Sequence, residues 1–188
     1  MKRLIVGVSG GSGMPIAIEL LRLLKENKEI ETHLIITRSA ELTLSQESDV
    51  TLEELRAMAD VIYDNENIGA GPASGTFKTI GMIVVPCSMK TAAGIATGYS
   101  DSLLLRACDV TLKERRRLVL VPRECPLSTV HLRNLLELSE MGAMILPPML
   151  AYYNHPKTIE DATVHVAGKI LDCFDLEAEG YRRWEGMQ

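Results

Sequence analysis

The sequence has few of the features that mark membrane, secreted or nucleic-acid-binding proteins. Its 188 residues include only four cysteines and 4% aromatic residues. The cysteines, at positions 87, 108, 125 and 173, form no C-x-x-C pair, which argues against a zinc site or a disulfide scaffold. A formal charge of −5 provides no overall basic field for nucleic acid or anionic lipid. No apolar stretch reaches the length that a bilayer requires.

The amino-terminal segment resembles a signal peptide only superficially. Its apolar run at residues 4–8 is too short, and a glycine-rich loop follows in place of a cleavage site. The scattered thiols fit a reducing compartment. The sequence therefore predicts a cytoplasmic protein with neither a membrane nor a nucleic-acid partner. Its length suits a single domain over residues 1–188, with a short polar tail from about residue 176.

Short apolar runs rich in β-branched residues alternate with longer segments of helical period. The runs are continuous rather than alternating, which indicates strands covered on both faces, as in a parallel sheet. We expect strands at residues 4–8, 33–37, 82–85, 118–121 and 144–146. We expect helices at residues 15–26, 40–47, 52–59, 101–116, 129–141 and 159–174, and a loop over residues 64–79. This order predicts a single-domain α/β fold with a Rossmann-like, doubly wound parallel sheet in three α/β/α layers.

In such a sheet ligands bind beyond the carboxyl ends of the strands, so the loops after the strands carry the functional signal. After the first strand, Gly10, Gly11 and Ser12 lie in a glycine-rich loop that precedes a helix, an arrangement that favours an anion. The spacing is not G-x-G-x-x-G, and Thr37 rather than an acidic residue follows the second strand. These features favour a mononucleotide over a dinucleotide. A tight strand-to-helix turn without a ligand is the alternative.

The loop after the third strand is a second candidate anion site. Ser88, Met89, Lys90 and Thr91 open another helix and supply two hydroxyls and a cation. The alternative is an N-cap serine beside a solvated lysine. Cys87 has no base paired with it in the sequence, so we expect it to pack rather than to react.

The last two loops combine charged and aromatic residues with prolines. Arg123 and Glu124 lie between two prolines, where the arginine could bind phosphate and the glutamate could act as an acid or base. A surface ion pair is the alternative. After the fifth strand, Tyr152 and Tyr153 follow a pair of prolines and suit the wall of a site for a flat ring or apolar chain. None of the four histidines has a serine and acid at informative spacing.

In this order the motifs resemble the flavin prenyltransferase family (UbiX-like), which includes the B subunits of non-oxidative phenolic acid decarboxylases. The resemblance extends from residue 2 to about residue 186. Its marks are the Gly-x-Ser-Gly-x-Ser-Gly start and segments spread along the chain, at residues 74–77, 86–91, 112–115, 123–124, 147–148, 151–153, 171–172 and 183–184. No single segment is specific, but their combination is.

The resemblance implies a homo-dodecameric, Rossmann-like flavoprotein. It would join the dimethylallyl group of dimethylallyl monophosphate to N5 and C6 of reduced FMN, and the prenylated FMN would serve a UbiD-type decarboxylase. By resemblance, Ser12 and Glu124 relay protons. The FMN-binding set is Gly10, Gly11, Ser12, Thr37, Ser88, Met89, Lys90, Thr91 and Arg123. The set for the prenyl phosphate is Tyr153, Lys169, Arg106, Lys113 and Glu47.

The residue chemistry suits this reaction. When an allylic phosphate departs, basic side chains can stabilise the leaving group, while flavin and tyrosine faces stabilise the carbon cation. We find no Asp-rich diphosphate motif, so no metal is expected. The chain departs from the usual family pattern at Gly11 (for Ala), Thr37 (for Ser), Leu150 (for Pro) and Tyr152 (for Phe), which affects the shape of the pocket.

Three other functions remain open at this stage. A peptidyl-cysteine decarboxylase on a related fold would need a catalytic histidine early in the chain and an Asn-rich loop, and we find neither. A non-catalytic FMN carrier would not need Glu124, Tyr153 and Lys169. An aromatic (phenolic) acid decarboxylase subunit would have to act on its substrate with FMN alone.

Overall fold

The computed structural model describes residues 1–186 and contains a parallel sheet of six strands. The strand order is β3-β2-β1-β4-β5-β6, and every pairing is parallel. The strands are β1 (Lys2–Val8), β2 (Ile30–Ile36), β3 (Val61–Tyr63), β4 (Gly81–Cys87), β5 (Arg117–Pro122) and β6 (Met144–Ile145). The chain moves outward in one direction from β1 to β3 and then returns to add β4 on the other side of β1. This order and the parallel pairing confirm the predicted doubly wound sheet.

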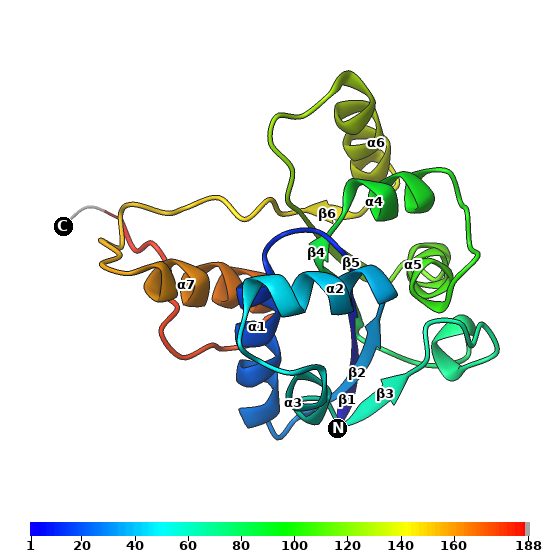
Figure 1. Ribbon diagram of the computed structural model, residues 1–188, viewed down its shortest axis with the longest axis horizontal. Coiled ribbons are helices and arrows are strands. Elements are labelled where there is room, and N and C mark those ends of the chain that lie inside the picture. The colour runs from blue at the N-terminus through cyan, green and yellow to red at the C-terminus, as the bar shows by residue number, and fades with distance from the viewer. Residues whose placement is uncertain (187–188) are drawn as a thin grey trace.

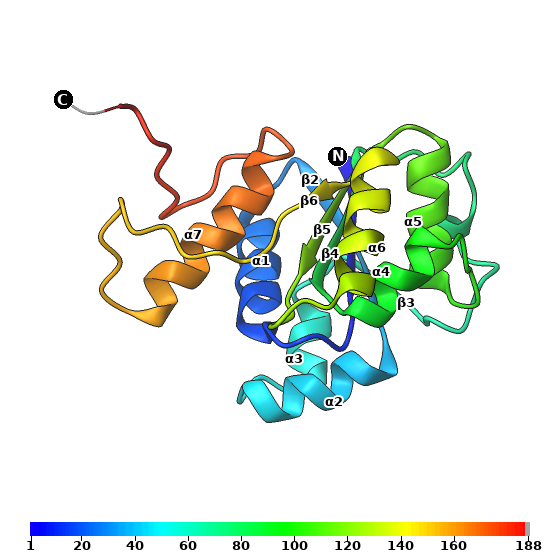
Figure 2. The ribbon, with the colours of Figure 1, turned by 90° about the horizontal axis from the view of Figure 1, so that it is seen from above.

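Helices cover both faces of the sheet, as predicted. They are α1 (Met14–Glu26), α2 (Arg38–Glu47), α3 (Leu52–Ala57), α4 (Met89–Ala96), α5 (Leu103–Lys113), α6 (Thr129–Glu140) and α7 (Ile159–Asp172), with a short 3₁₀ turn, η1, at Gly71–Ala73. Helices α1 and α7 pack side by side on one face, whereas α4, α5 and α6 lie on the other (Figures 1 and 2). Helix α2 begins at the carboxyl end of β2, in front of the sheet in Figure 1.

Side chains of each strand alternate between two hydrophobic cores. In β1, Leu4 and Val6 point into the core formed with α1 and α7, while Ile5 points into the core formed with α4 and α5. All three residues are at most 2% exposed. Because both faces of the strand are buried, its sequence is a continuous apolar run, and the reasoning that predicted a parallel sheet is confirmed.

The structure corrects three of the predicted elements. Strand β3 was not predicted: it lies between the helix expected over residues 52–59 and the loop expected over residues 64–79, and its three residues are all partly exposed and too few to form an apolar run. The helix expected over residues 101–116 spans Leu103–Lys113, since Ser102 caps its start and Arg115 has a left-handed backbone (φ 56°). Thr37 does not end β2 but forms the N-cap of α2.

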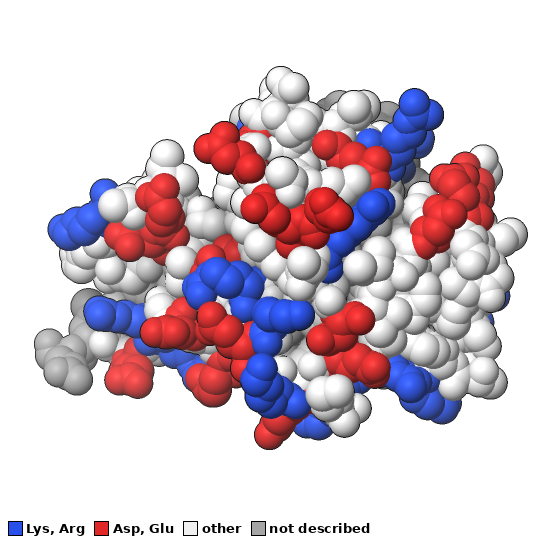
Figure 3. All heavy atoms as spheres, turned by 60° about the horizontal axis from the view of Figure 1, so that its bottom comes forward, with Lys and Arg blue, Asp and Glu red and all other residues white. Residues whose placement is uncertain are grey.

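The surface has no large region of one charge on the face shown in Figure 3, where basic and acidic side chains are interspersed. Ion pairs such as Arg22 with Glu19, at 2.7 Å, account for part of this mixing. Within residues 1–186, no helix is both long enough and apolar enough to cross a bilayer. The four cysteines are free, and three of them are buried. Burial raises the pKa of the Cys87 thiol to about 12, so it packs in the core.

Candidate functional site

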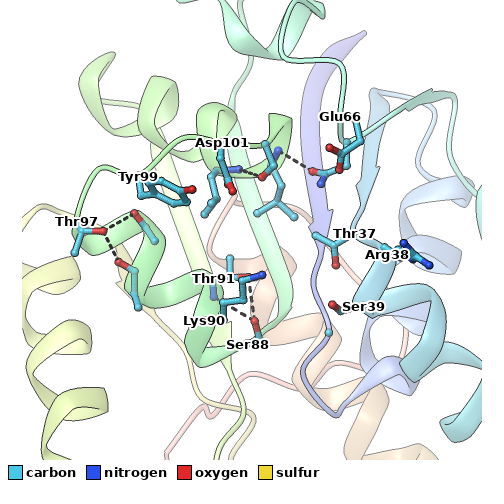
Figure 4. A pocket seen from close by; sticks show the side chains of 17 residues that line it. Thr37, Arg38, Ser39, Glu66, Ser88, Lys90, Thr91, Thr97, Tyr99 and Asp101 are labelled. Atoms are coloured by element: carbon cyan, nitrogen blue, oxygen red, sulfur yellow. Dashed lines mark hydrogen bonds between the residues drawn. The ribbon is translucent and has the colours of Figure 1, made fainter.

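A cavity of about 430 Å³ lies at the carboxyl edge of the sheet, beside the point where the strand order reverses. Its wall is built from the loops that follow β1, β2, β3 and β4 and from the start of α5. Figure 4 shows Thr37 and Ser39 on one side, facing Ser88, Lys90 and Thr91 on the other. This is the place where doubly wound sheets bind their ligands.

The start of α4 forms the floor of this cavity. The Ser88 hydroxyl caps the helix by accepting from the Thr91 N–H at 3.2 Å, and it lies 3.0 Å from the Thr91 hydroxyl. The buried hydroxyl of Ser9 donates to the Pro86 carbonyl at 3.0 Å and accepts from the Ser88 N–H at 2.8 Å. Ser9 therefore fixes the loop after β1 to the loop after β4. This link between the two loops was not predicted from the sequence, although Ser9 belongs to the glycine-rich motif.

Glycines permit close approach between the loops. A Cβ atom on Gly10 would lie 2.5 Å from the Cβ of Ser39, so only glycine fits against the start of α2. A Cβ atom on Gly11 would lie 3.4 Å from Pro86 and from the backbone of Ser88, which is an ordinary contact. The alanine that we associated with the family at position 11 would therefore fit here.

Charge is distributed unevenly around the cavity. Lys90 lies beside Ser88 and Thr91, while Glu66 and Asp101 lie toward the other end in Figure 4. The hydroxyls and the cation at the α4 end suit an anionic group, and the acidic end does not. Neither Glu66 nor Asp101 was predicted to line the site. Glu66 was missed because it follows β3, a strand that was not predicted.

The start of α1 is occupied by an internal carboxylate. Glu47, the last residue of α2, accepts from the backbone N–H groups of Gly13 at 2.8 Å and Met14 at 2.9 Å. Burial alone would raise the pKa of Glu47, but hydrogen bonds from Ser12, Gly13 and Met14 and the nearby charge of Arg123 outweigh it and lower the pKa. The glycine-rich loop was expected to favour an anion; in the structure the anion at the start of α1 is the Glu47 carboxylate, not a ligand. Ser12 of this loop and Arg123 of the loop after β5 lie near the same carboxylate.

Two further clusters lie away from the cavity. Tyr153, on the loop after β6, stacks edge-on against His165 of α7, and the Lys169 ammonium on the same helix pairs with Asp172 at 2.9 Å. On the opposite face of the sheet, Arg106 of α5 pairs with Asp109 at 2.5 Å. The Lys113 ammonium, at the end of the same helix, lies 2.6 Å from a Glu114 carboxylate oxygen.

Comparison with known proteins identifies the lineage. The chain matches the Flavoprotein family over residues 1–176. It is 52% identical over 186 residues to a probable UbiX-like flavin prenyltransferase of Streptomyces sp. (strain D7), covering 99% of this chain and 93% of that protein. The chain belongs to the UbiX-like flavin prenyltransferase family.

Solved structures of related proteins agree with this assignment. A dodecameric FMN-dependent UbiX-like decarboxylase from Escherichia coli O157:H7 is 49% identical, with a TM-score of 0.96 over 98% of this chain and 100% of that chain. AnUbiX (PadA1), solved with FMN and dimethylallyl pyrophosphate, is 44% identical, also with a TM-score of 0.96, over 100% of this chain and 99% of that chain. The flavin prenyltransferase fold thus extends over the whole described chain.

The structure brings only some of the residues that we predicted for a flavin prenyltransferase site to one place. Five line the cavity: Gly10, Thr37, Ser88, Lys90 and Thr91. Gly11 and Met89 adjoin it through their backbone, and the Met89 side chain is buried in the core. Apart from Glu124, the remaining residues lie outside the cavity, in the three clusters around Glu47, on α7 and on α5.

Glu124 stands apart from all of these groups. Its side chain is exposed on the loop after β5, next to Arg123. Among residues 1–186 it makes no hydrogen bond or ion pair, so the surface ion pair considered above does not form. The hydroxyl of Ser12 interacts with Glu47 and not with Glu124. A proton relay between Ser12 and Glu124 is therefore not formed in the isolated chain.

Proposed function

We propose that the chain is a flavin prenyltransferase, which joins the dimethylallyl group of dimethylallyl monophosphate to N5 and C6 of reduced FMN. The observation that carries this proposal is the polar cavity at the strand-order reversal, with hydroxyls and Lys90 at one end. Its volume of about 430 Å³ lies within the usual range for a small-molecule site, roughly 300–1,000 Å³. Family membership makes FMN the expected occupant.

The residues of the cavity fit FMN in a defined direction. Thr37, Ser88, Thr91 and Lys90 would hold the phosphate, because they supply the donors and the cation. Gly10 leaves room for the ligand and for the close contact with α2. The ring end would then extend out of the cavity toward Ser12 and Arg123, which the family resemblance assigns to the flavin. When bound, reduced FMN supplies the nitrogen and carbon atoms that are alkylated.

The prenyl phosphate needs basic residues that one chain does not bring together. Lys169 belongs to α7, where Tyr153 packs against His165, whereas Arg106 and Lys113 belong to α5. Helices α7 and α5 lie on opposite faces of the sheet (Figure 2). All four could contact one phosphate only if separate copies of the chain contribute them. We therefore propose that the site is completed in a homo-oligomer; the relative from Escherichia coli O157:H7 is dodecameric. Exposed apolar side chains on α6, such as Val130 (61%) and Leu136 (60%), support such contacts.

Basic and acidic side chains then have separate roles in the reaction. Lys169, Arg106 and Lys113 would stabilise the departing phosphate, and the Tyr153 face would stabilise positive charge on the allylic carbon. Closure of the new ring breaks the allyl double bond, which takes up one proton, while C6 loses one as its bond to carbon forms. Glu124 is the carboxylate that we assign to accept the C6 proton. Glu47 orients Ser12 beside this region.

One experiment tests the proposal against its alternatives. Under anaerobic conditions, the purified protein is incubated with FMN, dimethylallyl monophosphate and a reductant. The flavin is then extracted and its mass is measured by mass spectrometry. We expect a gain of one five-carbon prenyl unit. Bound but unmodified FMN would indicate a carrier. Release of CO₂ from a phenolic acid by this protein alone would indicate a decarboxylase.

We further propose that the product serves a UbiD-type decarboxylase in the cytoplasm. Prenylated FMN is a modified cofactor and not a metabolic end product, so a second protein must use it. Four free cysteines fit a reducing compartment. Adding the reaction mixture to a decarboxylase of this type prepared without cofactor should restore its activity, whereas FMN alone should not.

A further inference from the structure

Helix α7 carries a buried histidine that the reaction described above does not use. His165 is only 6% exposed, and its Nε2 atom lies 3.3 Å from the hydroxyl oxygen of Tyr153. The two rings meet edge to face, with centroids 5.7 Å apart. Tyr153 itself is 45% exposed, so its hydroxyl lies between a buried imidazole on one side and open surface on the other.

The other ring nitrogen of His165 decides which atom carries the proton. Nδ1 is buried and has no hydrogen-bond partner among residues 1–186. A buried N–H group without a partner is rarer and more costly than a buried acceptor without one. Burial and the charge of Lys169 lower the pKa of the His165 imidazole, which favours its neutral form. The favoured tautomer therefore has the proton on Nε2 and none on Nδ1.

This tautomer fixes the direction of the Tyr153 hydroxyl. If Nε2–H donates to the phenolic oxygen, the hydroxyl hydrogen has to point away from His165. It then faces the exposed side, where an anion can accept it. In the opposite tautomer Tyr153 would donate inward and present only lone pairs to an anion, which repels phosphate.

We infer that His165 is a positioning residue that makes Tyr153 a hydrogen-bond donor to the phosphate of the prenyl substrate. The inference rests on the proposed function for its ligand, since that function assigns the phosphate to Tyr153. The neighbouring residues are consistent with this role. Lys169 lies one helical turn beyond His165, so the donor and the cation share one side of α7. Trp184 packs against the Tyr153 ring, with centroids 5.3 Å apart, and restricts its movement.

The test compares three variants by calorimetric titration with dimethylallyl monophosphate. His165→Phe keeps a ring but loses the donor, and we expect its Kd to rise about 3–10-fold. His165→Gln retains an N–H donor near the position of Nε2 and should stay within about threefold of the parent protein. FMN affinity should not change in either variant. His155→Asn, on the same loop, is the control, because the His155 side chain is exposed and makes no hydrogen bond among the described residues.

A double-mutant cycle separates positioning from a general packing effect. In a Tyr153→Phe background, His165→Phe should cause no further loss, since the hydroxyl that it orients is gone. Equal losses from His165→Phe in both backgrounds would overturn the inference, as would parent-like binding in the single variant.

A direct measurement of the tautomer does not depend on turnover. Magic-angle-spinning NMR of the protein labelled with ¹⁵N-histidine should show His165, identified by the signal that disappears in His165→Gln, protonated at Nε2 and bare at Nδ1. An Nδ1–H signal from His165 would overturn the inference even if the protein prenylates FMN. If the parent protein binds dimethylallyl monophosphate but does not prenylate FMN, the proposed function fails. The tautomer and the double-mutant cycle still decide the role of His165 in that case.

Discussion

The carboxylate of Glu47 accepts a hydrogen bond from the backbone N–H of Gly13 at 2.8 Å, although 34 residues separate them. Gly13 is the N-cap of α1, and its own side chain cannot cap the helix. The first turn of α1 also has no acidic residue. Glu47 therefore supplies the negative charge that the start of this helix favours. It links the end of α2 to the glycine-rich loop.

Replacing Glu47 with glutamine should lower the free energy of unfolding by about 0.5–2 kcal/mol at neutral pH, since the charge at the helix start is lost. The folded-state pKa of Glu47 is below its ordinary value of about 4.3, so its contribution is fully present above that value. The contribution is lost as the pH falls through the folded-state pKa. The stability gap between parent and variant, measured by urea unfolding at fixed protein concentration, should therefore close in acid.

Glu29→Gln is the matched control for this prediction. Glu29 lies on the turn between α1 and β2, away from any helix start, is exposed, and makes no ion pair within the described part of the chain. It should show little change at either pH. A gap for Glu47→Gln that persists unchanged in acid would contradict the role assigned to its charge.

Gly10→Ala and Gly11→Ala should differ sharply, although the residues are adjacent. A methyl group on Gly10 would lie 2.5 Å from the Ser39 Cβ and 3.0 Å from its backbone carbon, so the loop or α2 has to shift. We expect a loss of stability of about 1–3 kcal/mol and a marked fall in bound FMN. Gly11→Ala should keep both within experimental error. Thermal unfolding and the flavin-to-protein absorbance ratio measure the two effects, and equal behaviour of the variants would contradict the packing described.

Lys90→Ala should weaken FMN binding about tenfold by removing a charged contact with the phosphate. Riboflavin has no phosphate, so its affinity should not change. Titration of flavin fluorescence with both ligands measures this difference. Lys113→Ala is the control for loss of a lysine, and it should leave FMN affinity unchanged. An equal loss of affinity for FMN and riboflavin would show that Lys90 does not contact the phosphate end of the flavin.

Glu124→Gln should retain FMN while slowing formation of the closed ring by roughly 10²–10⁴-fold, the usual contribution of a positioned acid or base. The amide keeps the shape but cannot take up the proton lost from C6. An adduct joined at N5 only should then accumulate, with the mass of the product but a different absorption spectrum. Full activity with FMN bound would leave Ser12 or the released phosphate as the proton acceptor.

Mixed oligomers test whether the prenyl-phosphate site is shared between copies. Arg106→Ala and Lys169→Ala should each weaken use of dimethylallyl monophosphate but spare FMN binding, because both residues are assigned to the prenyl phosphate. The two residues lie on opposite sides of the chain, so a site that contains both needs two copies. Co-expression of the two variants should restore part of the activity, since some sites then combine an intact Arg106 with an intact Lys169. Two variants that stay inactive when mixed would place both residues in one subunit's site.

The sequence was sufficient to predict the elements that have a strong periodic signal. Strand β4 and its neighbours are buried on both faces, so their composition follows directly from their position. Strand β3 could not be predicted in the same way. Its pairing with β2 is set by the tertiary structure, and its side chains are half-exposed.

Site residues could be predicted where their role depends on neighbours in the sequence, and could not where it depends on a contact with a distant residue. Ser88 and Lys90 could be assigned to the cavity because they open a helix directly after a strand. The capping of α1 by Glu47 joins positions 34 residues apart, and no local pattern encodes such a contact. The same holds for His165, whose partner Tyr153 reaches it through a loop without regular structure.

The two hydrogen bonds of the Ser9 hydroxyl make the floor of the cavity rigid before any ligand arrives. One buried hydroxyl joins the ends of the two central strands, so the β1 and β4 loops cannot separate without leaving the Ser88 N–H or the Pro86 carbonyl without its partner. The opposite wall is also fixed by bonds between distant segments, because the Thr37 N–H donates to the Val8 carbonyl at 3.0 Å and Glu47, at the end of α2, accepts from the Gly13 and Met14 N–H groups. Adaptation to a different flavin would therefore have to change side chains that line the cavity without forming these bonds, such as Arg38, and not move either wall.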